Sequence, residues 1–549
     1  WSSDVCSSDL PLFLAPFFLL MRDPLALVRL AQMALGLGSA TLGYFLSLRL
    51  FASRAAAGTS ALLLGLYWPF LIFEPRLLSA TLFVFLNLLG LLLSTRTEPD
   101  TATTNGCPSL AAAGFVFGLA VLVVPTAALP VLLITLGSAR GPGWTRIFRP
   151  VIFLACALLP VLPFIITDRV RTGEWFFLQT NGGLNLFLGN SPGADGTPWA
   201  RPGGTWDTLA ALPVRAGAES DVDRDRWFTR QALAFAADRP GALAALWARK
   251  ALLALNRREV YATIWPEFHR SLFCATRLPL PGFGIILALA AAGLPALPRG
   301  AGQRTTLLYL GGYFFALTAT VVSSRYRLPL AAGLCVLGGA GAVEVGRAGR
   351  ELWGWTRGVR PTQRAASVLL LAAAGALISW IPLSLPHASR MLAEERAHLA
   401  EAYLNKGRLK EGEAYARSAL EADPESALAF LQLARAAAAS GSREEALKWL
   451  KRAAAADPRS SEARYQYAFG LAATGNLDGA LSEMRAAVAA APQRVTVLMG
   501  MAELGARAGN LGEARAALER VYRLRPGFAP ARKLEQMIDA GPAGPGVSP

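Results

Sequence analysis

Prolines recur at a fixed step near the carboxyl end of the chain. They stand 34 residues apart, at Pro424, Pro458, Pro492 and Pro526. Glycines keep the same step, at Gly407, Gly441, Gly475 and Gly509. A constant period of this length is typical of a solenoid in which each unit is a pair of helices. The sequence therefore predicts an α-solenoid over residues 391–530, with units beginning near 393, 427, 461 and 495.

Small side chains occupy two further positions of the repeat. Twelve residues before each proline stand Gly412, Ala446, Ala480 and Ala514. Five residues before it stand Ala419, Ala453, Ala487 and Val521. This pattern resembles the tetratricopeptide repeat, in which small residues let the two helices of a unit approach closely. The resemblance implies a groove that binds a peptide or protein, and the alternative is a spacer or dimerisation element.

The chain before the repeats is apolar enough to be a membrane domain. Over the whole sequence 53% of residues are hydrophobic and 17% are charged, whereas soluble proteins carry about 25% charged residues. We expect ten membrane helices within residues 11–390, near 28–48, 57–73, 77–93, 110–124, 126–138, 150–167, 278–297, 305–322, 327–345 and 366–385. The predicted fold class is mostly α: a polytopic transmembrane helix bundle followed by an α-solenoid.

Arginine in the short loops predicts how the helices cross the membrane. Arginines crowd the loops at 139–149, 298–304 and 346–365, and such loops stay in the cytoplasm. By alternation, the long loop 168–277 and the repeats lie outside. Arginine far outnumbers lysine, and alanine is also abundant. This composition indicates a GC-rich bacterial genome. We therefore expect a multi-pass protein of the bacterial inner membrane, with loop and repeats on the periplasmic side.

The long loop contains a helical pattern at 226–258 that is broken at Pro240. Leu246, Lys250 and Leu253 keep helical spacing. One reading is an amphipathic helix in the plane of the lipid headgroups. The other is an ordinary helix packed on the bundle.

Both ends of the sequence are expected to lie outside the folded domains. Residues 1–10 read as a leader foreign to the protein, and residues 531–549 as a disordered tail. The net charge of +16 comes without a basic helix or an aromatic-interleaved stripe, so no nucleic-acid partner is predicted. The scattered cysteines and three histidines form no metal-ligand pattern, so no metal site is predicted.

Four short segments stand out in the apolar part: Pro-Leu-Phe at 11–13, Leu-Leu-Ser-Ala-Thr-Leu-Phe at 77–83, Thr-Asn-Gly-Gly-Leu-Asn-Leu-Phe-Leu-Gly-Asn at 180–190 and Ser-Arg-Tyr-Arg-Leu-Pro at 324–329. Together they resemble motifs of the GT-C glycosyltransferases, which use lipid-linked sugars. The resemblance is to bacterial protein mannosyltransferases and aminoarabinose transferases, of the family 39 kind. The second segment departs from the family, which commonly has glutamate at the position of Ala80.

The resemblance implies a donor site for a polyprenyl-phosphate sugar. Arg325, Tyr326 and Arg327 would hold the donor phosphate, since the forked guanidinium suits phosphate. The alternative is that these arginines only anchor a helix end. The sugar or acceptor would meet Asn181, Gly182, Gly183, Asn185 and Asn190, unless this segment is only a turn-rich structural loop.

Inverting transfer also needs a carboxylate to deprotonate the acceptor. In the resembled family an aspartate after the first membrane helix does this, and that region is expected upstream of the given chain. Glu74 is the substitute considered, although pairing with Arg76 is the more ordinary reading. The given polypeptide is therefore expected to lack its catalytic aspartate. No cofactor is certain, and a divalent cation is left open.

The predicted function is therefore transfer of a sugar from a polyprenyl-phosphate donor to an extracytoplasmic acceptor, with the repeats recruiting the acceptor or a partner protein. Two alternatives stay open: a non-enzymatic membrane-anchored scaffold for an envelope complex, and a lipid-linked oligosaccharide ligase. The expected partners are the lipid-linked sugar, the bilayer and a protein or peptide. The sugar, the acceptor class and the oligomeric state are not predicted.

Overall fold

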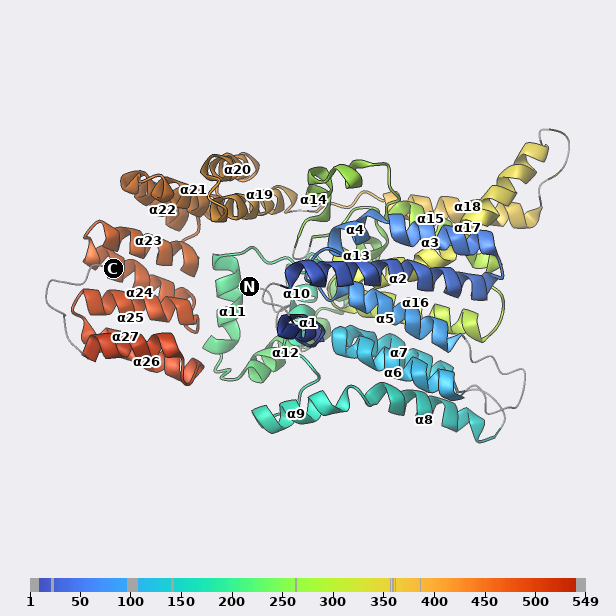
Figure 1. Ribbon diagram of the computed structural model, residues 1–549, viewed down its shortest axis with the longest axis horizontal. Helices are drawn as coiled ribbons and strands as arrows, with labels where there is room; N and C mark the ends of the chain where they lie inside the picture. Colours follow the sequence, from blue (N-terminus) through green and yellow to red (C-terminus); the bar gives the residue numbers. More distant parts are fainter. Residues whose placement is uncertain are drawn as a thin grey trace. The chain divides into compact units, whose positions relative to one another are not determined.

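A computed structural model describes most of the chain, and the regular secondary structure of the described part is helical. The described residues are 9–20, 24–95, 107–139, 143–261, 264–355, 357, 360, 362–385 and 387–539. No strand occurs among them. The chain divides into two compact units: unit 1 is residues 1–199 with 220–384, and unit 2 is residues 200–219 with 385–549. Figure 1 shows the helices of each unit.

Every apolar stretch predicted from the sequence is helical in unit 1. Its helices are α1 (Asp9–Leu20), α2 (Leu25–Phe51), α3 (Arg54–Leu66), α4 (Trp68–Phe73), α5 (Ala80–Ser94), α6 (Cys107–Val123), α7 (Ala128–Gly137), α8 (Thr145–Leu158), α9 (Leu162–Thr172), α10 (Gly182–Gly189), α12 (Asp221–Asp238), α13 (Pro240–Leu255), α14 (Pro266–Leu272), α15 (Phe283–Gly293), α16 (Ala301–Ala319), α17 (Ser324–Trp355) and α18 (Gln363–Trp380). The leader expected at residues 1–10 lies almost wholly outside the described residues.

Fewer of these helices than expected are long enough to cross a membrane alone. Among the described residues, α2, α17 and α18 are long and apolar enough, and α8 with α9 forms a fourth candidate bent by 48°. Two predicted spans are interrupted: 57–73 between α3 and α4 at Tyr67, and 150–167 between α8 and α9 near Pro160. Hydropathy does not register such breaks, because a proline changes the backbone without making the segment polar.

Helix α17 forms the centre of unit 1. It packs against α15, α3, α2, α5 and α18, and its amino-terminal half is buried. Glycines make the close packing geometrically feasible. A Cβ added at Gly341 would lie 1.7 Å from the Leu289 carbonyl oxygen, and one at Gly339 would lie 2.3 Å from that of Ala56. Small residues at helix contacts are the usual way in which apolar helices approach one another.

The helical pattern at 226–258 forms two helices, as predicted, and the chain breaks at Arg239 just before Pro240. Helix α13 packs against α16, α18 and α15. Leu246, Lys250 and Leu253 are all buried. The packed-helix reading therefore fits α13, since its striped face is covered by protein.

Unit 2 is a regular array of helix pairs. Its array helices are α19 (Ala388–Asn405), α20 (Leu409–Ala422), α21 (Ala427–Ala439), α22 (Arg443–Ala456), α23 (Ser461–Ala473), α24 (Leu477–Ala490), α25 (Val495–Arg507), α26 (Leu511–Leu524) and α27 (Ala529–Asp539). Three of the four predicted starting points, 427, 461 and 495, are the first residues of α21, α23 and α25. Helix α11 (Gly204–Arg215), from the loop of unit 1, also belongs to unit 2.

The periodic glycines form the turns of the repeat, and the periodic alanines allow its helices to pack closely. Gly407, Gly441, Gly475 and Gly509 end the first helix of each pair with φ between +71° and +85°, a conformation that costs residues with a Cβ about 1–2 kcal/mol. Ala453, Ala487 and Ala514 are fully buried between paired helices. The 34-residue period thus arises from two requirements of each unit, a tight turn and a close contact between its helices.

The predicted tail is partly wrong. Residues expected to be disordered from 531 onward continue as α27 up to Asp539, and residues 540–549 lie outside the described residues. Ala531 and Ile538 of α27 are buried, packed in the core of the last repeat. A solenoid needs such a terminal helix because its last repeat has no neighbour to cover its apolar face.

Candidate functional site

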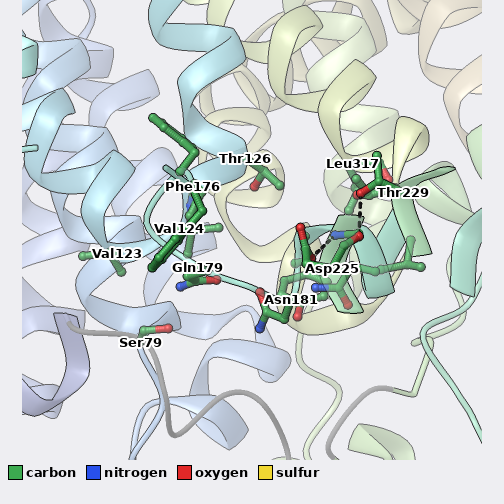
Figure 2. Close-up of a pocket in the computed structure, with 18 of the residues that line it drawn as sticks. Ser79, Val123, Val124, Thr126, Phe176, Gln179, Asn181, Asp225, Thr229 and Leu317 are labelled. Carbon is green, nitrogen blue, oxygen red and sulfur yellow. Dashed lines mark hydrogen bonds between the residues drawn. The ribbon is translucent and has the colours of Figure 1, made fainter. Parts of the chain in front are cut away.

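Unit 1 contains a cavity of about 440 Å³ that gathers several of the predicted segments. Ser79 lies at the start of α5, Thr126 between α6 and α7, and Gln179 and Asn181 just before α10. Helix α12, the end of α16 and the start of α17 complete the wall. Figure 2 shows the polar groups of Ser79, Gln179 and Asn181 among apolar side chains such as Val123 and Phe176.

Helix α12 holds α10 in place through Asp225. The backbone N–H of Gly183 donates to the Asp225 carboxylate at 2.5 Å (Figure 2). Burial raises the pKa of Asp225 above its ordinary value, while hydrogen bonds from Gly183 and Leu184 act to lower it. A Cβ at Gly183 would lie 2.0 Å from the Asp225 carbonyl oxygen. Glycine at 183 is thus needed for close packing, and Asp225 caps the first turn of α10.

The asparagine and glycine motif is divided between the cavity and the core. Asn181, Gly182, Gly183 and Asn185 line the cavity, as a site for a polyol would require. Asn190 does not line it. Its Nδ2 donates to the carbonyl oxygens of Leu186 and Ala319, and its Oδ1 accepts from Lys250 Nζ at 2.8 Å. The predicted sugar contact of Asn190 is therefore wrong, because both ends of its amide are bonded inside the protein.

Lys250, on α13, is a second buried polar group next to the asparagine and glycine motif. Its ammonium is buried and donates to Asn190 Oδ1, to the carbonyl oxygen of Gly189 at 3.2 Å and to that of Thr320 at 3.0 Å. Burial lowers the pKa of Lys250 to about 8. These bonds join α13 to the ends of α10 and α16, two helices whose residues form part of the cavity wall.

The segment at 324–329 also has two roles. Arg325 and Tyr326 line the cavity, and Arg325 Nη2 donates to Tyr326 Oη at 2.7 Å. Tyr313 Oη donates to the carbonyl oxygen of Tyr326 at 2.9 Å. The structure thus places Arg325 and Tyr326 where a ligand of the cavity would meet them.

Arg327 points into the core instead. Its Nη2 donates to Glu259 Oε2 at 2.7 Å and its Nη1 to the carbonyl oxygen of Asn256 at 2.6 Å. Both side chains of the ion pair are at most 1% exposed. Tyr67 Oη donates to the other Glu259 oxygen at 3.2 Å. The predicted phosphate contact of Arg327 is wrong, since its guanidinium neutralises a buried carboxylate.

Glu74, the substitute for a catalytic carboxylate, stands apart from the cavity lining. It follows α4, and its carboxyl group lies against α2, where a Cβ at Gly36 would lie 2.2 Å from Glu74 Oε1. Burial raises the pKa of Glu74 to about 7. Among the residues that line the cavity, Asp225 is the carboxylate, so the expected role of Glu74 does not fit this pocket.

Sequence reasoning missed the cavity residues on α12. Asp225, Arg226 and Thr229 line the wall, and Arg226 Nη1 is paired with Glu174 Oε2 at 3.0 Å. Their spacing of one and four residues placed them on a helix but gave no sign of which partner they meet. In the described part of the chain, no three His, Cys, Asp or Glu side chains are grouped as a metal site.

The array of unit 2 presents paired aromatic rings. Tyr403 and Tyr415 are stacked with centroids 5.2 Å apart, and Phe430 and Trp449 with centroids 5.9 Å apart. The guanidinium of Arg452 lies over both rings of the second pair. Tyr465 and Phe469 form a third pair, on α23. Phe430 is buried, and the other five rings are partly buried. Partly exposed aromatic side chains are frequent anchors in protein interfaces.

Comparison with known proteins identifies the array. Two family models, both described as tetratricopeptide repeat, match residues 403–468 and 470–527. The carboxyl-terminal part of the chain is a tetratricopeptide-repeat domain. No curated protein matches the chain. No catalytic family is indicated, and the resemblance to GT-C glycosyltransferases is not shown.

Solved structures similar to the chain include MamA, PilW and YrrB, the last of which is described as a TPR protein with an unusual peptide-binding site. MamA is 20% identical, with 26% of this chain and 83% of that chain covered and a TM-score of 0.24. PilW, described as a type IV pilus biogenesis factor, is 21% identical. The match covers 27% of this chain and 70% of PilW, with a TM-score of 0.25. YrrB is 22% identical, with 35% and 90% covered and a TM-score of 0.23.

Proposed function

We propose that the chain is a membrane-anchored adaptor whose tetratricopeptide-repeat domain binds a protein or peptide partner. The observation that carries this proposal is the match of two repeat models along 403–527, over an array in which turns and core follow the repeat. Solenoids of this kind present an extended concave surface, which is their usual binding site. The long apolar helices α2, α17 and α18 support the anchor.

The side of the membrane is part of the proposal. Arginine-rich loops before α8, α16 and α18 support a cytoplasmic location of those loops. The array would then lie on the extracytoplasmic face of a bacterial inner membrane. A reporter enzyme that works only outside the cytoplasm, fused after residue 549, should be active. Activity of a cytoplasm-only reporter at the same place would contradict this location.

Photo-cross-linking in cells tests the adaptor role. Arg435 and Glu503 are exposed and occupy the same position in the first helices of two repeats. A photoreactive amino acid at each of these positions should yield an adduct with one and the same protein. A photoreactive residue at Leu233, exposed on α12 of unit 1, is the control and should not give that adduct. Adducts with lipid or with the chain itself alone would contradict the adaptor role.

A second function is favoured by the cavity of unit 1. Three segments that resemble glycosyltransferase motifs meet there, through Ser79, through Asn181 with Asn185, and through Arg325 with Tyr326. This convergence supports transfer of a sugar from a polyprenyl-phosphate donor, with Arg325 at the donor phosphate. Since chemistry of this kind needs a general base, the candidate among the residues that line the cavity is Asp225.

Sugar transfer is tested with a labelled donor. Membranes containing the chain are given a radiolabelled polyprenyl-phosphate hexose, and label in protein, lipid and glycan fractions is counted. The enzyme reading predicts transfer that Arg325→Ala removes and that Arg350→Ala, exposed at the far end of α17, leaves unchanged. Equal label with and without the chain would reject the enzyme reading and leave the adaptor.

A further inference from the structure

A segment of the chain already occupies part of the repeat domain. Residues 200–219 interrupt unit 1 between α10 and α12, yet they fold as part of unit 2, where α11 packs against α24. Figure 1 shows α11 in light green beside the orange and red helices of the array. A loop segment held by a protein-binding array is a candidate for an intramolecular ligand.

Charge complementarity connects the start of the segment with two successive repeats. Arg201 Nη2 lies 3.3 Å from Asp423 Oδ2 and donates to the carbonyl oxygen of Glu425 at 3.1 Å. The backbone N–H of Gly204 donates to Asp457 Oδ2 at 2.7 Å. Asp423 and Asp457 are equivalent, 34 residues apart and each directly before a repeat proline. The segment therefore binds the same position, an aspartate before the repeat proline, in two successive repeats.

The feature is limited to two repeats. At the same position the third repeat has Ala491 and the fourth has Arg525. Neither an alanine nor an arginine can accept the hydrogen bonds that the two aspartates accept. The occupied surface is thus specific for the junctions after α20 and α22, and the segment would gain nothing by binding further along.

The two partners cap one another's helices. Gly204 is the first residue of α11, and its N–H is satisfied by Asp457. Ser461 is the first residue of α23, and its N–H donates to Asp207 Oδ2 at 2.7 Å. Ser461 and Asp207 are both buried. Backbone N–H groups at a helix start lack partners within the helix. Each of the two carboxylates therefore accepts a hydrogen bond from an N–H group that its own helix leaves without a partner.

Glycine is required where the segment meets the array. Gly203 has φ of +93°, and a Cβ there would lie 2.5 Å from Asp457 Oδ2. A Cβ at Gly204 would lie 2.6 Å from Arg459 Cβ and 2.8 Å from the Arg459 carbonyl carbon. The sequence Arg201-Pro202-Gly203-Gly204 with Asp207 therefore matches this surface in charge, in backbone conformation and in size.

We propose that residues 200–219 are a built-in ligand of the repeat domain, and that an outside protein segment of the same chemistry competes with them. This rests on the proposed adaptor function. The competing segment has an arginine, then a glycine turn that opens a helix, with an acid in the first turn of that helix. A tethered ligand acts at an effective concentration on the order of millimolar, so an outside partner must displace it to bind here.

Amide hydrogen exchange on the full chain in detergent tests the occupancy. In the wild type the amides of Gly204 and Ser461 should exchange slowly. Asp207→Ala should speed exchange at Ser461 by tenfold or more, although the two residues are 254 positions apart. The control Asp478→Ala, at an exposed aspartate of α24, should change neither amide. Unchanged exchange at Ser461 in Asp207→Ala would overturn the proposal.

Competition is tested with a fluorescent synthetic peptide of residues 200–219, by anisotropy. The peptide should bind the full-length Gly204→Ala variant at least tenfold more tightly than the wild type, because the variant's own segment no longer fits. Gly512→Ala, where an added Cβ meets nothing, should behave like the wild type. Equal affinity for wild type and Gly204→Ala, or no binding to Gly204→Ala, overturns the proposal.

The outcomes separate this inference from the adaptor function. Suppose that an outside protein is cross-linked at Arg435 but the peptide binds neither the wild type nor Gly204→Ala. That result would refute the proposal of a built-in ligand and would leave the adaptor function supported. Peptide binding without an outside partner would refute the adaptor, and it would make residues 200–219 a ligand that serves only this chain.

Discussion

Unit 1 and unit 2 are both built from helices, yet they use glycine in opposite ways. In unit 2 the repeated glycines stand at turns with φ between +71° and +85°, and at all four an added Cβ would meet no atom within 4 Å. In unit 1 the glycines of α17 lie inside a regular helix, and their missing side chains make room for neighbouring backbones. A turn depends on a few neighbouring residues, so the glycine that it requires can be recognised in the sequence when the turn is repeated. A close helix contact depends on a partner far away in the chain, so the sequence near the glycine does not identify it.

The largest difference between the units should come from their ion pairs. Glu259→Gln leaves Arg327 charged and buried in unit 1, which should destabilise that unit by about 3–5 kcal/mol. Glu513→Gln breaks the exposed pair between Arg485 and Glu513 in unit 2, which should cost less than about 1 kcal/mol. Denaturant unfolding of each variant in detergent measures both. Equal effects would mean that the buried pair is solvated.

The next effect depends on pH and concerns Glu74. Its pKa is raised to about 7 from 4.5 by burial, so the folded state holds its proton more tightly than the unfolded state. Its contribution to stability is full below about pH 4.5 and is lost as pH rises to 7, by about 2–3 kcal/mol.

Glu74→Gln is the matched variant for this experiment. The stability of the wild type relative to Glu74→Gln should fall between pH 4.5 and 7 and stay level above pH 7. A flat difference over this range would show that the Glu74 carboxyl is solvated as in water.

A smaller effect tests the close packing of α17. Gly339→Ala places a Cβ 2.3 Å from the Ala56 carbonyl oxygen and should cost about 1–3 kcal/mol through overpacking. Gly346→Ala lies on the same helix with nothing within 4 Å and should be neutral or slightly stabilising. Thermal unfolding of the two variants side by side measures the difference. A harmless Gly339→Ala would mean that α3 and α17 can separate at little cost.

The smallest effect concerns the turns of unit 2. Gly441 has φ of +85° and an open surrounding, so Gly441→Ala should cost about 1–2 kcal/mol from backbone strain alone. Gly441→Asn should recover part of this loss, since asparagine tolerates the left-handed region. Amide hydrogen exchange in α21 and α22, the helices that this turn joins, measures both variants. An alanine variant as stable as the wild type would show that the turn adjusts.

The sequence predicted unit 2 closely because its determinants are short-range. The residues 427, 461 and 495 were recognised as starting points from the period alone, and they begin α21, α23 and α25. The exceptions are contacts that no period contains. Helix α27 covers the last repeat, and α11 enters the array from a loop more than 170 residues earlier in the chain.

For unit 1 the sequence predicted the helices but only part of the site. Asn181, Asn185, Arg325 and Tyr326 line one cavity, although 180–190 and 324–329 are far apart in the chain. Asn190 and Arg327 belong to the same motifs but point into the core. A motif records which residues are near one another in sequence, and the side of the backbone on which each side chain lies depends on packing. Asp225 was missed because its partner, the start of α10, is 42 residues away.

One measurement tests the central claim, which is that partner binding belongs to the repeat domain. A photoreactive residue at Arg435 is combined with Phe469→Ala in the array or with Arg325→Ala in the cavity, and the adduct formed in cells is quantified. The account predicts loss of the adduct with Phe469→Ala and no change with Arg325→Ala. An adduct that survives Phe469→Ala but disappears with Arg325→Ala would contradict the claim and move the partner's site to the cavity.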